Sequence, residues 1–203
     1  MQVESAGAGR DTDSAAVLRA IRERRSIGKC TEEIPDPEII RQVLEAGTWA
    51  PNHHLTEPWR FVVLSGDART GLGEAMGEAA AREAANVEAG ETARSRAVGK
   101  PLRAPYVIAI YADPDPSAPE IEEIASAAAA AQNMLLAAHA LGLAAMWRSG
   151  ALIYSPEVRR YLNLPERAVM LGVLYVGYPA MEPPQRERRP MDDVVAWWDA
   201  APE

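Results

Sequence analysis

Cysteine is nearly absent from this sequence, since Cys30 is the only one among 203 residues. An intrachain disulfide is therefore excluded, and a thiolate metal cluster would need several other ligands. A surplus of positive charge is missing too, because 21 Lys and Arg stand against 29 Asp and Glu, giving a formal net charge of −8. Binding along a phosphate backbone needs such a surplus, so we expect no nucleic-acid partner. The scarcity of cysteine favours a reducing, cytoplasmic setting.

Long hydrophobic runs are also absent. Residues 1–13 lack an apolar signal core, and the least polar stretch, residues 124–146, is alanine-rich and interrupted by polar residues. We therefore expect neither export nor a membrane span. The composition, 48% apolar and 25% charged, is typical of a soluble globular protein. We predict a flexible N-terminus over residues 1–12 and a single domain over residues 13–203.

Helix signals recur along the chain. A helix capped by Asp13 or Ser14 is expected to end near two arginines, and another has Asp36 as its cap and Gly47 as its stop. Further helices are expected in 67–99, 119–141 and 155–164. The 67–99 stretch has few large apolar residues, so we expect it to bury little and to be exposed and mobile or to lie over a pocket.

Four short apolar runs between turn signals predict strands, because they are rich in β-branched and aromatic residues. They are residues 59–66, 105–113, 143–147 and 168–179. Strands interleaved with more numerous helices indicate an α+β domain with a modest central sheet. Spacing alone does not give the strand order.

Several common site motifs are missing. No G-x-S-x-G elbow, phosphate-binding loop or dinucleotide-binding glycine pattern after a strand occurs, and "GLGEAMG" from Gly71 lies in a helical context. His53 and His54 are adjacent, and no cysteine, carboxylate or third histidine stands at a recognised metal-ligand spacing. We therefore expect no metal site, and no single residue stands out as a general acid or base.

Two short arginine-containing segments are better candidates for ligand binding. Arg24 and Arg25 precede Ser26 at a helix end, where two guanidinium groups and a hydroxyl suit a phosphate and a polyol, although a solvated basic helix end has the same pattern. In the second segment, residues 148–150, an arginine, a serine and a glycine directly follow an expected strand, where ligand sites often lie. Trp147, taken alone, is more typical of a core residue.

Two long segments resemble the flavin-dependent nitroreductase family, in particular its small bacterial NAD(P)H nitroreductases of the YdjA type. They are "RRSIGKCTEEIPDPEIIRQVLEAGTWAPNHHLTEPWRFVVL" and "GLAAMWRSGALIYSPEVRRYLNLPERAVMLGVLYVGYP". The resemblance implies an α+β fold in which helices flank a central, mainly antiparallel sheet. It also implies an intertwined homodimer, with tightly bound FMN in two clefts at the interface and NAD(P)H as the reductant.

The resemblance further assigns residues to the cofactor. Arg24, Arg25 and Ser26 would hold the phosphate and ribityl chain, and the segment Trp147, Arg148, Ser149 and Gly150 would contact the flavin from its other side. The partner subunit would contribute its own copies of Trp49 and His53, and Asn52 is a further candidate for contact with the cofactor. The C-terminal pattern "RERRP" makes Arg186 and Arg188 further candidates for the phosphate.

The implied activity is a ping-pong reduction of nitroaromatic, quinone or related small electrophilic acceptors. The cofactor would supply the redox chemistry, so the residues named here have binding roles. A second hypothesis keeps the fold and the flavin without turnover, as a storage or sensing protein. Bleaching of the bound flavin by NAD(P)H would distinguish the two.

Overall fold

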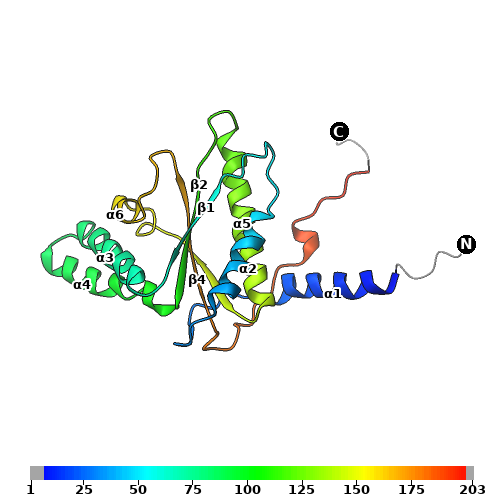
Figure 1. Cartoon of the computed structure of the whole chain (residues 1–203), viewed down its shortest axis with the longest axis horizontal. Helices are drawn as coiled ribbons and strands as arrows, with labels where there is room; N and C mark the ends of the chain where they lie inside the picture. Colours follow the sequence, from blue (N-terminus) through cyan, green and yellow to red (C-terminus); the bar gives the residue numbers. More distant parts are fainter. Residues whose placement is uncertain (1–6, 200–203) are drawn as a thin grey trace, which may run out of the picture.

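A four-stranded sheet forms the centre of the computed structural model, which describes residues 7–199 and, for residues 7–12, the backbone alone (Figure 1). The strands are β1 Trp59–Leu64, β2 Tyr106–Ala112, β3 Ala144–Arg148 and β4 Val169–Gly177. Their order is β1-β2-β4-β3, and every neighbouring pair is antiparallel. The predictions of an α+β fold and a mainly antiparallel sheet are therefore confirmed.

Helices cover both faces of the sheet (Figure 1). On one face lie α2 Pro37–Thr48 and α5 Glu120–Ala140, and on the other lie α3 Asp67–Arg82, α4 Val87–Val98 and α6 Pro156–Tyr161. Helix α1, Gly7–Glu23, projects from the α5 side, as does the C-terminal segment, and two 3-10 turns occupy Pro101–Arg103 and Met191–Asp193. Among the described residues, no helix is both long and apolar enough to cross a membrane.

Alternation along β2 supplies a core on each side. Tyr106, Ile108 and Ile110 face the α2 and α5 layer and belong to the first core. Val107 and Ala109 face α3 and α6 and belong to the second core. This is the period of two expected for a strand that is buried on both faces. The continuous apolar sequence of the strand follows from that burial.

A β-bulge changes the register in β4. Ile110 pairs with Gly172 and Tyr111 with Met170, so Leu171 has no partner on β2. Gly172 has a φ of 141°, which L side chains rarely adopt, and a Cβ there would lie 2.5 Å from Arg148 O. The bulge leaves the carbonyl of Leu171 available to a side chain.

Helix α5 fills the first core with small residues. Ala127, Ala130, Ala131 and Met134 are fully buried, so the helix lies close against the sheet and α2. Gly47 of α2 was expected to stop its helix, but the helix continues to Thr48. The glycine instead permits close packing, because a Cβ there would lie 2.9 Å from Met134 Cγ.

The expectation that residues 67–99 bury little is wrong for helix α3, although Arg69 and Met76 of this helix do line pockets. Leu72, Ala75 and Met76 belong to the second core, with Val107 and Val158 among its members. Small residues bring the backbones together, as at Gly73, where a Cβ would lie 2.1 Å from Val98 O. Tight packing of small side chains thus replaces the large apolar residues that the sequence lacks there.

The N-terminal helix begins earlier than its predicted cap at Asp13 or Ser14. Helix α1 starts at Gly7, so residues 7–12 of the expected flexible segment are helical, while residues 1–6 lie outside the described part. The predicted cap at Asp36 is confirmed, because Asp36 accepts from Glu38 N at 2.8 Å. In the helix expected over 155–164, Ser155 is the cap and accepts from Val158 N at 3.3 Å.

Candidate functional site

The segment after α1, residues 24–30, is called the arginine loop here. Arg24 N donates to Ala20 O at 3.0 Å as the helix ends, and Ser26 forms a parallel bridge with Ala145 of β3. Ile27 N then donates to Ala145 O at 3.2 Å. Because β3 is an edge strand, this pairing docks the loop beside a free sheet edge, with Ser26 exposed.

Arg24 is the unusual residue of this loop. Its Nη1 atom is buried and has no hydrogen-bond partner among the described residues. Burial lowers the pKa of the Arg24 guanidinium, and the positive charges of Arg188 and Arg25 lower it further. Buried cations are normally paired, so this one is placed to receive an anion.

The other predicted arginines differ in their positions. Arg188 lies near enough to Arg24 for its charge to act there, which places part of the C-terminal segment near the arginine loop. Arg25 folds back on its own helix end, where its Nη1 donates to Arg22 O at 2.5 Å and to Arg24 O at 3.0 Å. Arg186 is exposed, and its charge is not among those that act on Arg24.

The segment Arg148–Gly150 begins at the last residue of β3. Arg148, Ser149 and Gly150 line a pocket of about 230 Å³ together with Lys100 and Tyr175. Gly150 has a φ of 121° and space around its Cα, so the turn needs glycine for its conformation rather than for room. At about 3.3 Å per residue, Arg148 lies on the order of 10 Å along β3 from Ala145 and its partner Ser26.

Trp147 has a structural role in this arrangement. Its indole packs against the first core, and Nε1 donates to Leu171 O at 3.1 Å. That carbonyl is the one that the bulge in β4 leaves without a strand partner. Trp147 therefore holds the end of β3 in place while its neighbour Arg148 reaches the pocket.

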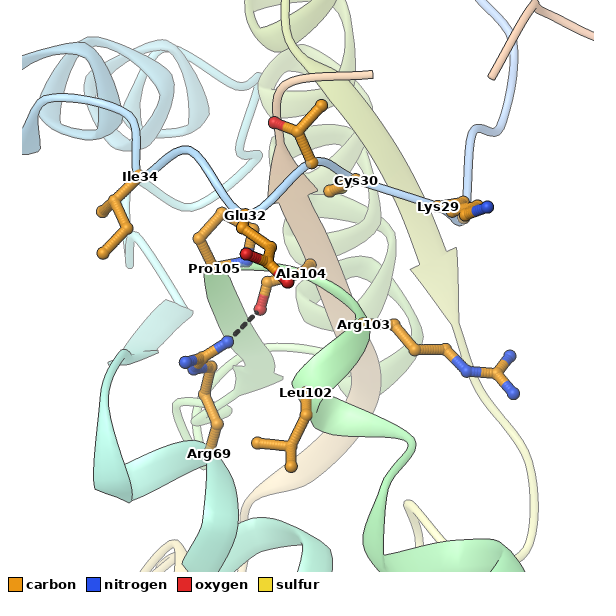
Figure 2. Close-up of a pocket in the computed structure, with 11 residues that line it drawn as sticks. Lys29, Cys30, Glu32, Ile34, Arg69, Leu102, Arg103, Ala104 and Pro105 are labelled. Atoms are coloured by element: carbon orange, nitrogen blue, oxygen red, sulfur yellow. Dashed lines mark hydrogen bonds between the residues drawn. The ribbon is translucent and has the colours of Figure 1, made fainter. Parts of the chain in front are cut away.

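A second pocket, of about 610 Å³, adjoins the arginine loop (Figure 2). Lys29, Arg69 and Arg103 supply positive charge to its lining, and Arg69 Nη1 donates to Ala104 O at 2.7 Å. In Figure 2, Arg103 extends away from Arg69. The sequence reading missed these three residues, and only Lys29, close to the Arg-Arg-Ser motif, carried a signal.

Two side chains that line these pockets, Tyr175 and Cys30, have shifted pKa values. Burial raises the pKa of Tyr175, while the charges of Arg148 and Arg103 lower it, so guanidinium groups from both pockets lie near one tyrosine. Cys30 lines the larger pocket, and burial raises the pKa of its thiol to about 11. The thiol is therefore protonated near neutral pH and is a poor nucleophile.

The remaining predicted residues lie in residues 49–57, called the histidine loop here. Trp49 is 79% exposed and lines an apolar groove of about 450 Å³ between α1, α2 and α5. His53 is exposed in a turn, and Asn52 Oδ1 accepts from Glu57 N at 3.1 Å. Asn52 is thus engaged within its own loop.

A buried carboxylate holds the histidine loop. Glu123 is 1% exposed, and its Oε1 accepts from Thr56 Oγ1 at 2.6 Å while its Oε2 accepts from Asp115 N at 3.0 Å. Leu55 and Glu57 have positive φ values of 55° and 47°, so the loop has a conformation that needs such support. The sequence reading missed Glu123, although its spacing to Ala127 and Ala130 places it on the buried face of α5.

Trp49 lies beside α1 and the C-terminal half of α5, but the arginine loop and the His53 turn lie at opposite ends of α5. The arginine loop lies at the C-terminal end, where Ile27 shares a pocket with His139 and Leu143. The histidine loop contacts the first turn of α5 through Glu123. A helix of 21 residues spans about 30 Å, so one chain does not bring the arginine loop and the His53 turn to one small ligand.

Comparison with known proteins identifies the family. The model of the family described as "Nitroreductase family" matches residues 21–178. YdjA of Escherichia coli (strain K12), which carries the name NAD(P)H nitroreductase, is 33% identical over 167 residues, covering 81% of this chain and 89% of YdjA.

Solved structures give the same result. A nitroreductase-like family protein from Bacillus cereus has a TM-score of 0.80 at 25% identity and covers 98% of this chain and 100% of its own. A nitroreductase with bound FMN from Bacteroides fragilis NCTC 9343 has a TM-score of 0.71 at 25% identity, covering 90% and 98%.

Proposed function

The chain belongs to the nitroreductase family, and from that premise we propose a specific activity for it. It is an FMN-dependent oxidoreductase that uses NAD(P)H to reduce nitroaromatic, quinone or related small electrophilic acceptors. NAD(P)H and the acceptor occupy the same site in turn, as a ping-pong cycle requires. Residues 13–203 act as one FMN-binding domain.

The observation that carries the proposal is the buried Nη1 of Arg24, which has no hydrogen-bond partner in residues 7–199. A phosphate would accept its hydrogen bond, and the charges of Arg188 and Arg25 would add to the attraction. Ser26, exposed beside β3, offers a hydroxyl to the polyol chain. The donor set therefore fits the phosphate end of FMN.

The far end of β3 suits the flavin ring. FMN, when bound, accepts a hydride from NAD(P)H and passes reducing equivalents to the acceptor. Arg148, Lys100 and Arg103 supply fixed positive charge near the end of β3, where it would stabilise negative charge on the reduced ring. Gly150, with its φ of 121°, permits the turn that brings Arg148 and Ser149 to the pocket that they line.

A homodimer would complete each site. Asn52 and His53 lie too far from the arginine loop of their own chain to share its ligand, so they are proposed, together with Trp49, to reach the cofactor of a partner. Helix α1 and the C-terminal segment project on the same side of the molecule (Figure 1). Exposed large apolar side chains on these segments and at residue 49 are typical of an association surface. They are Val17, Leu18, Ile21, Trp49, Val194, Trp197 and Trp198.

The substitution Arg24→Ala tests the phosphate assignment. We expect FMN affinity to fall by about 1–3 kcal/mol, because a charge-assisted contact is lost, whereas riboflavin, which has no phosphate, should bind as before. Flavin fluorescence titration of the apoprotein measures both ligands. Arg19→Ala, an exposed change on the same helix, is the matched control. An equal loss for FMN and riboflavin would contradict the assignment.

Turnover is tested on the FMN-loaded protein under anaerobic conditions. NADPH or NADH should bleach the flavin absorbance, and a quinone or nitroaromatic compound should restore it. Steady-state rates at several acceptor concentrations should give the parallel reciprocal plots of a ping-pong cycle. Tight FMN binding without bleaching would favour the storage or sensing hypothesis instead.

A further inference from the structure

Two histidines and a carboxylate come together at the N-terminal end of α5. The rings of His53 and His54 have centroids 4.3 Å apart, and His54 Nε2 lies 3.4 Å from Glu122 Oε2. One nitrogen from each histidine and one oxygen of Glu122 all lie within 4.8 Å of one another. We propose that these three side chains bind a divalent transition-metal ion of the zinc class.

The donor set matches that chemistry. Two imidazoles and one carboxylate are ligands that zinc accepts, with bonds of about 2.0–2.2 Å, and tetrahedral ligands then lie about 3.3 Å apart. The three groups need to close by on the order of 1 Å or more. Both histidines are exposed in a turn, so rotation of their side chains can supply this movement without a change in the core.

Glu122 adds a specific reason to place a cation here. Its Oε2 atom is buried and has no hydrogen-bond partner among the described residues, although the neighbouring Glu123 uses both of its oxygens. The contact of Glu122 with His54 is an ion pair only when the imidazole is protonated. A metal ion would satisfy the carboxylate with both imidazoles neutral.

The surrounding charge also favours a cation. The first turn of α5 carries Glu120, Glu122 and Glu123, and Asp115 lies near enough to His54 for the two charges to interact. Arg167 pairs with Asp113 and acts on Asp115 as the opposing positive charge. Three protein ligands leave one tetrahedral position for water, so we infer an accessible site that exchanges its ion.

A consequence for activity rests on the proposed function. His53 is the residue proposed to reach the partner's flavin, and a bound metal would hold that imidazole at Glu122 instead. Metal binding would therefore inhibit the FMN-loaded enzyme, and a chelator would restore it. The metal site itself requires neither flavin nor turnover.

Metal binding is measured on FMN-loaded protein that has been treated with a chelator and desalted. Zn²⁺ titrated by calorimetry should bind one ion per chain, and Co²⁺ should give the intense visible absorption of a tetrahedral site. His54→Ala and Glu122→Gln should each weaken Zn²⁺ binding at least tenfold. His139→Ala, which removes the remaining histidine, is the matched control and should leave binding unchanged.

Equal Zn²⁺ binding by wild type and Glu122→Gln, or no binding by wild type, would overturn the site. The flavin spectrum of each variant shows whether it is folded, and it also separates failure here from failure of the proposed function. In the rate assay, Zn²⁺ should inhibit wild type and spare Glu122→Gln. Binding without inhibition would overturn the consequence drawn for His53.

Discussion

At the C-terminal end of α5, the half-buried Arg24 has a buried Nη1 without a hydrogen-bond partner among the described residues. At the N-terminal end, Glu123 is a buried carboxylate whose two oxygens both accept hydrogen bonds. The first arrangement costs free energy until an anion binds, which is typical of a ligand site. The second fixes the conformation of a loop. One helix thus separates a part of the molecule suited to binding from a part that positions side chains.

The largest effect is expected from Glu123→Ala, which breaks the second arrangement. Thr56 Oγ1 and Asp115 N lose their acceptor in a buried setting, so the free energy of unfolding should fall by about 2–4 kcal/mol. Urea denaturation measures the change. Glu123→Gln keeps the shape and one acceptor oxygen, and should lose less. A loss below about 0.5 kcal/mol for the alanine variant would contradict the role of Glu123.

A smaller effect is expected from Arg188→Ala, which sharpens the account of the arginine end. Arg188 is exposed and acts on Arg24 through its charge, so FMN affinity should fall by about 0.5–1 kcal/mol, and by less at high salt. Arg186→Ala, two positions earlier and also exposed, is the comparison. An equal or greater loss of FMN affinity for Arg186→Ala would contradict the assignment of this effect to Arg188.

The smallest effect concerns acid stability at the histidine end. Arg167 Nε donates to Asp113 Oδ1 at 2.6 Å, and this hydrogen bond lowers the pKa of Asp113. A carboxyl group whose pKa is lowered by folding stabilises the folded state at pH values above its unfolded pKa of about 3.9. This stabilisation is lost as the pH falls through the pKa of the folded state.

The substitution Arg167→Ala should therefore lower stability slightly at neutral pH and flatten its dependence on pH below about 4. Urea midpoints measured from about pH 6 to about pH 3 test this. The Asp113 side of the pair is mostly covered, but Arg167 is exposed, so the change should be small. If the substitution left the dependence of stability on pH unchanged in acid, Arg167 would not be the group that lowers the pKa of Asp113.

The secondary structure could be predicted where local chemistry decides it. Asp36 before Pro37, Ser155 before Pro156 and the continuous apolar runs gave the correct helices and strands, because caps and side-chain periods act over a few residues. The packing of α3 could not be predicted in this way. The burial of α3 depends on the close approach of Gly73 to Val98 of α4. A contact between two helices leaves no local period in the sequence.

The candidate site divides in the same manner. The Arg-Arg-Ser and Arg-Ser-Gly segments were visible because each is short and contiguous. The neighbourhood of Arg188 and Arg24 was suggested only through the family resemblance, and the roles of Lys100, Arg103 and Glu123 were missed. These residues acquire their roles from the antiparallel sheet, which brings distant segments beside β3 and α5.

By itself, the sequence determined the elements and the chemical types of the side chains, because capping, alternation and charge are local properties. Only the tertiary structure decided which of those side chains share a site. It buried Nη1 of Arg24 within reach of the charge of Arg188, engaged Asn52 within its own loop, and set His53 and His54 against Glu122. The reason is that burial and proximity arise from the packing of whole elements, and so no motif around "NHH" encodes the carboxylate that completes the cluster.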